Sequence, residues 1–230
     1  MTERRSKGGR EVPNVCAGPF GAVYDFYIER PRLMQVVGRA LWGIDASILY
    51  AQMKPIGEAG AGAVIADVPC GGGVAFRALA PEQEVRYLAG DLSPKMLRRA
   101  QRRAERRGLA QVEVGEADMT SLPYGNAEVD LFLSFSGLHM IPEPGKAVGE
   151  IARCLKPGGR LVGTTFLDGG SLRARTAFKL GGFQGHAVPP AREQLAALLA
   201  ESGLTEVRLG TERGFTSFTA LKPLTSGTGS

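Results

Sequence analysis

Residues 64–73, Val-Ile-Ala-Asp-Val-Pro-Cys-Gly-Gly-Gly, constrain the fold of this chain more than any other stretch. A short apolar run ends in Asp67, three glycines follow, and residues 74–79 have a helical pattern. A strand, a glycine turn and a helix start in this order are typical of the first unit of an α/β nucleotide-type site. Because glycine has no Cβ, the turn lets the backbone approach a ligand closely. The stretch therefore predicts an α/β fold with a ligand at the end of its first strand.

Strand and helix patterns alternate along the rest of the chain. The predicted strands are 63–68, 85–89, 112–114, 129–135, 160–166, 206–209 and 215–221, and the predicted helices are 74–79, 94–107, 145–155, 171–180 and 191–202. The alternation predicts βαβ units with right-handed crossovers and a largely parallel sheet. Only residues 210–214 separate the last two strands, which is too short for a crossover helix, so these two strands should pair antiparallel. We expect seven strands, mostly parallel, with one antiparallel strand near the C-terminus.

The chain is predicted to divide into a core and less regular ends. Residues 1–12 and 224–230 are expected to be disordered tails, and residues 59–223 to form the core. Residues 13–58 carry apolar side chains at three- and four-residue spacing, which predicts an N-terminal helical arm or lid. Within the arm, Asp45 is predicted to cap a helix over 46–53.

Composition places the chain among globular enzymes, with 43% hydrophobic and 22% charged residues. Its cysteines, Cys16, Cys70 and Cys154, are odd in number and far apart, which argues against a disulfide framework or a zinc site. No signal peptide and no run of membrane-spanning length is found. We therefore expect a cytoplasmic protein without a metal, either a monomer or a homodimer.

The net charge of +5 is concentrated in one segment. Residues 95–107 hold seven lysines and arginines against Glu105, which is 7 − 1 = +6, so the remainder of the chain carries −1. The basic residues recur at three- and four-residue intervals and so share one helical face. Since no aromatic residue is interleaved for base stacking, a solvated outer face is favoured over a nucleic-acid surface.

The glycine loop fails two familiar phosphate-binding patterns. After Gly71 and Gly73 a dinucleotide fingerprint requires glycine at position 76, where this chain has Phe76, and no Gly-Lys-Ser/Thr follows. These departures weaken the alternative of a nicotinamide-dependent oxidoreductase. The loop instead suits a ligand whose nearest end is small and carries no phosphate.

Carboxylates after the next two strands extend this site. Asp91 ends the second strand, 24 residues after Asp67, where a carboxylate accepts hydrogen bonds from ribose hydroxyls. The alternative is a helix cap, a role that Ser93 before Pro94 fills better. Asp118, leaving the third strand, is a candidate acceptor for an adenine amine with Met119 against the ring, although a plain polar loop is the alternative.

Five motifs in order resemble the class I S-adenosylmethionine-dependent methyltransferases. They span about residues 60–166, and the most specific are Asp-Leu-Ser-Pro-x-Met-Leu from Asp91 and Leu-Lys-Pro-Gly-Gly-Arg-Leu-Val from Leu155. The closest branch is the small-molecule one, similar to ubiquinone and menaquinone methyltransferases. The resemblance implies a Rossmann-like three-layer α/β/α fold and S-adenosyl-L-methionine as the cofactor.

The resemblance also implies roles for single residues. Asp67, Cys70, Gly71 and Gly73 would surround the methionine moiety, Asp91 would hold the ribose with Leu92 beside the adenine, Asp118 and Met119 would bind the adenine, and Ser134 and Phe135 would lie near the sulfonium. One departure stands out, because the family usually has glycine where this chain has Pro69. Proline removes a backbone donor and fixes φ, so the loop can meet the cofactor differently.

The catalytic prediction is narrower. His139 follows the fourth strand and is the candidate general base, with a packed loop histidine as the alternative. Tyr24 of the arm is expected beside the cofactor, while Tyr27, Phe135 and His186 are substrate candidates. The predicted function is transfer of a methyl group to the O, N or C atom of a small molecule. The alternatives are a non-catalytic S-adenosylmethionine-binding regulatory module and an RNA methyltransferase.

Overall fold

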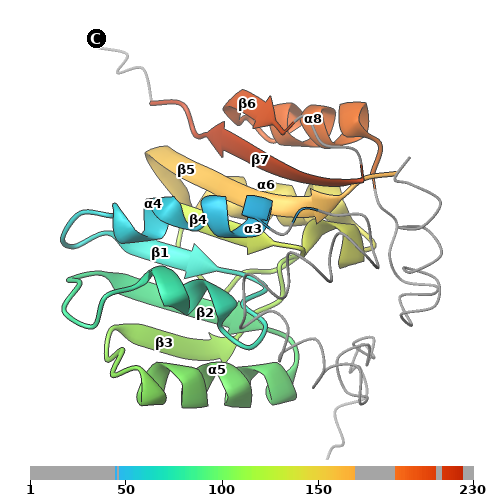
Figure 1. The fold of residues 1–230 in the computed structure, drawn as a ribbon. Helices are drawn as coiled ribbons and strands as arrows, with labels where there is room; N and C mark the ends of the chain where they lie inside the picture. The colour runs from blue at the N-terminus through green and yellow to red at the C-terminus, as the bar shows by residue number, and fades with distance from the viewer. Residues whose placement is uncertain (1–44, 46, 169–189, 211–213, 225–230) are drawn as a thin grey trace, which may run out of the picture.

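The computed structural model describes residues 45, 47–168, 190–210 and 214–224 (Figure 1). Its strands are β1 (Val64–Asp67), β2 (Arg86–Asp91), β3 (Val112–Glu116), β4 (Val129–Phe135), β5 (Leu155–Phe166), β6 (Thr205–Leu209) and β7 (Phe215–Leu221). Its helices are α3 (Ser47–Ala51), α4 (Lys54–Gly57), η3 (Val74–Ala78), α5 (Pro94–Arg106), η4 (Leu138–Met140), α6 (Pro144–Cys154) and α8 (Arg192–Glu201). None of the helices in these ranges is long and apolar enough to cross a membrane.

All seven strands form one sheet in the order β3-β2-β1-β4-β5-β7-β6. The pairs β2–β3, β1–β2, β1–β4 and β4–β5 are parallel, whereas β7 runs antiparallel to both β5 and β6. The predicted seven-stranded, mostly parallel sheet with one antiparallel strand is therefore confirmed. From β1 the chain continues to β2 and β3 on one side, and it then crosses to β4 and β5 on the other side of β1. The topological switch point therefore lies between β1 and β4. Open α/β sheets bind ligands outside the carboxyl ends of strands at such a point.

Each face of the sheet is covered by its own apolar cluster. Alternating residues of β1 divide between them, with Ile65 in one cluster and Ala66 in the other. Leu49, Met53 and Ile56, from α3, α4 and the turn between them, join the cluster that also holds buried residues of η3 and α5. The opposite cluster takes its helical residues from η4, α6 and α8. The two clusters give the helix–sheet–helix layering seen in Figure 1.

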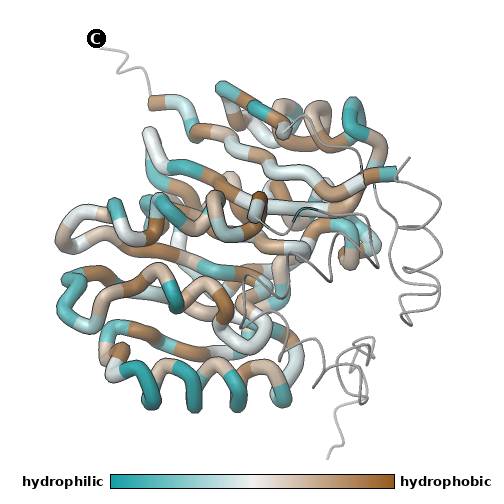
Figure 2. Tube along the Cα trace, in the orientation of Figure 1, coloured by the Kyte–Doolittle hydropathy of each residue, from teal (hydrophilic) through white to brown (hydrophobic). Residues whose placement is uncertain are grey.

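Helix α5 shows why the predicted elements form where they do. Ser93 adopts an extended backbone and its side chain accepts a hydrogen bond from the Met96 amide, while Pro94 occupies the first turn. Met96, Ala100 and Ala104 are buried against the sheet. The basic residues fall on the remaining surface, so the outer side of α5 is strongly hydrophilic in Figure 2.

The structure refines the predicted elements in two places. The helix predicted over 74–79 is a 3₁₀ helix, Val74–Ala78, entered from Gly73 in the left-handed conformation without a side-chain cap. The strand predicted over 160–166 begins earlier, at Leu155, so Pro157-Gly158-Gly159 lies inside β5, and the β4–β5 register shifts between Val129 and Leu131. Strand periodicity did not reveal this irregular start. The helix predicted over 171–180 lies outside the described residues.

Close packing across β5 makes Gly163 a sensitive position. A Cβ on Gly163 would lie 2.5 Å from the carbonyl oxygen of Ser134 and would collide with the ring of Phe218. Gly149, exposed in the middle of α6, has no atom within 4 Å of the same position. We predict that Gly163→Ala lowers the free energy of unfolding by about 1–3 kcal/mol. Gly149→Ala is the matched control and should raise it by about 0.5–1 kcal/mol. Urea denaturation measures both, and equal effects would contradict the packing described.

Candidate functional site

The carboxyl ends of β1, β2 and β4 meet at the switch point of the sheet. Asp67 ends β1 and pairs with Ala89 of β2 on one side and Leu133 of β4 on the other. Asp91 ends β2, two residues beyond Ala89 and therefore on the same face of the sheet as Asp67. Parallel register thus brings together two carboxylates that are 24 residues apart in sequence.

The glycine loop is tied to the end of β2 by backbone hydrogen bonds. The Cys70 amide donates to the Gly90 carbonyl at 2.8 Å, and the Gly71 amide donates to Asp91 Oδ2 at 2.9 Å. Gly71 and Gly73 both have positive φ, +54° and +76°, which an L side chain adopts only with strain. A Cβ on Gly71 would meet no atom within 4 Å, so this glycine borders open space.

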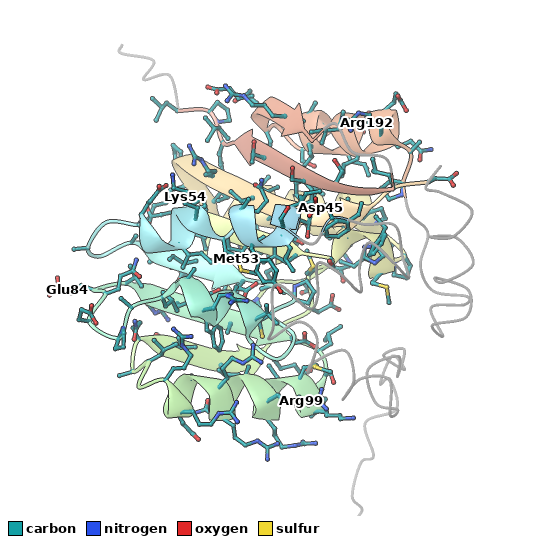
Figure 3. All side chains as sticks on the ribbon, in the orientation of Figure 1. Asp45, Met53, Lys54, Glu84, Arg99 and Arg192 are labelled. Atoms are coloured by element: carbon teal, nitrogen blue, oxygen red, sulfur yellow. The ribbon has the colours of Figure 1, made fainter. Side chains whose placement is uncertain are left out.

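Phe76 replaces the third glycine of a dinucleotide fingerprint for a visible reason. Its ring occupies the space that a Cβ on Gly73 would need, and it is fully buried. The Cβ and Cδ of Arg99, which is labelled on α5 in Figure 3, lie 3.6 and 3.9 Å from the Cβ position of Gly72, so α5 also packs on the loop. The glycines therefore serve close packing as well as the left-handed turns.

Asp67 is the most deeply buried carboxylate of this region, with 1% of its surface exposed. Its Oδ2 accepts a hydrogen bond of 2.9 Å from the Tyr87 hydroxyl, whereas no group in the described parts of the chain donates to its Oδ1. Burial raises the pKa of Asp67 to about 7; the Tyr87 hydrogen bond opposes this rise and the nearby charge of Asp91 adds to it.

Asp91 is held by backbone amides instead. Its Oδ1 accepts from the Ser93 amide at 2.8 Å and its Oδ2 from Gly71. Burial raises the pKa of Asp91 although these amides lower it. Across the described ranges, no lysine or arginine forms an ion pair with either carboxylate, so a ligand with positive charge fits this pair.

Asp118 and Met119 lie on the loop after β3, beside the end of β2, where Ala117 donates to the Asp91 carbonyl at 3.4 Å. Asp118 is half-buried, and its Oδ1 accepts from both the amide and the hydroxyl of Thr120 at 2.8 Å. Met119 is buried in the core cluster with Leu122. Asp118 thus faces a partly open environment while Met119 does not. Leu92, half-buried, follows Asp91 directly.

Pro69 is accommodated by a glycine on the neighbouring loop. Its ring occupies the place where a Cβ of Gly137 would be, so only glycine fits at position 137. Ser134 is fully buried beside these two residues, and its hydroxyl has no hydrogen-bond partner among the residues that the structure describes. Phe135, at the end of β4, is half-buried.

His139 lies in η4 and is 2% exposed. Its Nδ1 is 3.3 Å from the Thr165 hydroxyl, and its ring packs edge-on against Phe166 with centroids 4.9 Å apart. Burial lowers the pKa of His139 to about 3, so the imidazole is neutral at physiological pH. Three other candidates, Tyr24, Tyr27 and His186, lie outside the described residues.

Sequence reasoning missed two residues of this region, Tyr87 and Gly137. The alternation of β2 could have placed Tyr87 on the same face as Asp91, because residues 87, 89 and 91 point to one side of the sheet. The partner of the Tyr87 hydroxyl, however, follows only from the β1–β2 register. Gly137 carries no positive φ, so nothing in the sequence marks its contact with Pro69.

The raised pKa of Asp67 has a consequence for the stability of the free protein. Between about pH 4 and the folded pKa of about 7, the folded chain keeps a proton that the unfolded chain releases, so stability falls as pH rises through this window. We therefore compare the free energy of unfolding of Asp67→Asn with that of the parent protein. We predict that this difference moves in favour of the variant by about 2–4 kcal/mol when the pH is raised from about 4 to about 8. Urea denaturation at both pH values measures the gain. Glu116→Gln, at an exposed carboxylate, is the control and should show no such trend.

Comparisons with known proteins match this architecture. Residues 66–163 match the family described as "Methyltransferase domain". An uncharacterized chloroplastic methyltransferase of Arabidopsis thaliana, At2g41040, is 30% identical over 173 residues, which is 70% of this chain and 48% of that protein. The demethylmenaquinone methyltransferase of Clavibacter sepedonicus is 32% identical over 150 residues, 65% of this chain and 57% of that protein. The chain thus spans about half the length of these curated relatives.

Solved structures share the fold. Phosphoethanolamine N-methyltransferase 2 of Haemonchus contortus, in complex with S-adenosyl-L-methionine, is similar with a TM-score of 0.65 at 18% identity. The similarity covers 76% of this chain and 52% of that one. At this level of identity, the likeness concerns the arrangement of helices and strands alone.

Proposed function

We propose that the core of this chain is a class I S-adenosylmethionine-dependent methyltransferase domain, and that the protein transfers the methyl group of S-adenosyl-L-methionine to a small-molecule acceptor. The observation that carries the proposal is the pair of buried carboxylates, Asp67 and Asp91, at the carboxyl ends of β1 and β2. The glycine loop joins them, and no basic residue in the described ranges neutralises them. The cofactor, with its sulfonium and α-ammonium groups, carries the positive charge that this pair lacks.

The residues present fit the cofactor at both of its ends. The Asp91 carboxylate has about four lone-pair sites, and the backbone amides of Gly71, Ser93 and Leu92 occupy three at most, so it can still accept a hydrogen bond from a ribose hydroxyl. Asp67 Oδ1 and the open space beside Gly71 suit the methionine end. In this proposal Cys70 and Gly73 complete the wall of the methionine end. Leu92 and Asp118 lie near the adenine.

Met119, Ser134 and Phe135 of the predicted set have different roles in this proposal. Met119 packs in the core with Leu122, so it supports the loop that carries Asp118 rather than covering the adenine itself. Ser134 and Phe135 end the strand next to β1, and the unpartnered hydroxyl of Ser134 is available to a group that enters beside Pro69. The site therefore combines direct contacts from loops with support from the strands.

The chemistry asks little of the protein beyond positioning. The bound cofactor supplies an electrophilic methyl group on its sulfonium. Holding an acceptor in line with that methyl contributes an effective molarity of about 10⁵–10⁸ M in well-oriented systems. His139 is neutral and so is ready to accept a proton, but a pKa of about 3 makes it a weak base in the free protein. We therefore assign most of the expected acceleration to orientation and exclusion of water.

The small-molecule class of the acceptor is supported by relatives rather than by the site itself. One relative is named for demethylmenaquinone and another for 27-O-demethylrifamycin SV, both small organic molecules. The atom that accepts the methyl group depends on the substrate, and the substrate candidates Tyr27 and His186 lie outside the described residues. The proposal therefore extends to the class of acceptor and not to one compound.

Cofactor binding gives the first test. Asp91→Ala removes the acceptors for the ribose hydroxyls, and we predict that the dissociation constant for S-adenosyl-L-methionine rises about 10- to 100-fold. Isothermal titration calorimetry measures it, with circular dichroism to show that the variant is folded. Asp130→Ala is the matched control, because Asp130 also accepts a backbone amide, that of Val64, but at the start of β1. Equal losses in both variants, or no binding by the parent at millimolar cofactor, would contradict the proposal.

Turnover gives the second test. Quinones, phenols, amines and fatty-acid-like acceptors are incubated with cofactor labelled on its methyl group, and mass spectrometry locates the transferred methyl. With the acceptor found, His139→Ala should lower kcat by about 10²-fold or more if the imidazole takes the acceptor proton, while leaving cofactor affinity unchanged. Unchanged kcat would remove His139 from the catalytic set. Cofactor binding without transfer to any acceptor would favour the regulatory module.

A further inference from the structure

Tyr87 is a fully buried tyrosine of β2, on the face of the sheet that also carries Asp67. Its hydroxyl donates to Asp67 Oδ2 at 2.9 Å. Its ring packs edge-to-face on Phe76, with centroids 5.4 Å apart and planes at 88°, and Phe76 in turn fills the space beside Gly73. One side chain of β2 therefore contacts both the carboxylate that ends β1 and the aromatic ring that supports the loop.

A buried phenol is costly unless its hydroxyl is paired, so a phenylalanine would suit this apolar position better on packing grounds alone. The hydrogen bond is thus the feature that tyrosine adds at position 87. It uses one oxygen of Asp67 and fixes the rotation of the carboxylate. The other oxygen is buried, and within the described ranges no donor reaches it.

We propose that Tyr87 is a positioning residue for cofactor binding, which holds Asp67 so that its second oxygen is directed to the positively charged methionine end of S-adenosyl-L-methionine. The inference rests on the proposed function, since it assigns a role toward the same cofactor. It adds a residue outside the five sequence motifs. It also predicts that the Tyr87 hydroxyl acts through Asp67 alone.

The charges around Asp67 favour this arrangement. The groups that interact with it electrostatically are Tyr87 and Asp91 of β2, Cys70 of the glycine loop and Tyr124 of the loop after β3. All are neutral or negative. Burial raises the pKa of Tyr87, so its hydroxyl keeps the proton it donates. Within the described part of the chain, the Tyr87 hydroxyl is thus the one group that stabilises the anionic form of Asp67 before a ligand arrives.

A pH dependence follows from these groups. Asp67 has a pKa of about 7, so it becomes negatively charged as pH rises through neutrality, and affinity for a cationic ligand should rise with it. Because the Tyr87 hydrogen bond lowers that pKa, its removal raises the pKa further and moves the rise in affinity to higher pH. His139 does not contribute, since its pKa of about 3 lies below this window.

The test is a double-mutant cycle of Tyr87→Phe and Asp67→Asn, in which the phenylalanine keeps the ring packing on Phe76. Isothermal titration calorimetry measures the dissociation constant for S-adenosyl-L-methionine between about pH 5.5 and about pH 7.0, a range in which the ligand's own amine, with a pKa of about 7.7–8.0, stays largely protonated. Tyr50→Phe is the matched control, because it removes a half-buried tyrosine hydroxyl from α3. Melting temperatures are recorded for every variant.

We expect Tyr87→Phe to weaken binding about tenfold near pH 6.5, with a smaller loss at the top of the range. In the Asp67→Asn background the second change should add nothing, because the hydroxyl has no charge left to stabilise. Tyr50→Phe should follow the parent curve. A purely structural role predicts a lower melting temperature with the pH dependence of affinity unchanged.

The outcomes separate this inference from the proposed function. If the parent binds the cofactor and Tyr87→Phe keeps its pH dependence, or if the two changes weaken binding independently, the positioning role is wrong while the proposed function stands. If the parent itself does not bind the cofactor at millimolar concentration, both are overturned. A parent affinity that is flat across the pH range would also contradict the role of Asp67.

Discussion

The proposed site at the carboxyl ends of the strands depends on two carboxylates, Asp67 and Asp91. Both are buried, and neither has a basic partner among the described residues. Burying an unpaired charge is unfavourable, and the protein relieves it only in part, with one tyrosine hydroxyl and a few backbone amides. The remaining imbalance raises the pKa of both groups. A positively charged ligand supplies the missing partner for these carboxylates, so its binding is favoured by an electrostatic cost that the free protein already carries.

The fold creates this arrangement through register and close packing. Parallel pairing of β1 with β2 places both carboxylates on one face of the sheet, and left-handed glycines return the chain to the end of β2. Gly137 admits the Pro69 ring, so the proline that departs from the usual family pattern has a matching glycine on the next loop. The departure is thus accommodated by packing, and the backbone amides of Cys70 and Gly71 remain engaged with β2.

Much of the fold was accessible from sequence because its signals are local. Strand periodicity, the short link between the last two strands and the Ser93-Pro94 helix start predicted the elements and the antiparallel pair. The irregular start of β5 was missed, since Pro157-Gly158-Gly159 has the composition of a turn wherever it lies. In the site, Asp67 and Asp91 were found because strand ends are visible in sequence. The Tyr87 hydrogen bond and the burial of Met119 depend on contacts between distant segments, which no local pattern encodes.

Our central proposal is that the buried carboxylate of Asp67 lacks a cationic partner in the free protein and gains one when the cofactor binds. Carbon-13 NMR of the Asp67 carboxyl, assigned by its loss in Asp67→Asn, reports its ionisation directly in the free protein and in the presence of saturating S-adenosyl-L-methionine. We predict a pKa of about 7 in the free protein and a value lower by about one unit or more when the cofactor is bound. An ordinary pKa in the free protein, or a value that the cofactor leaves unchanged, would contradict the account.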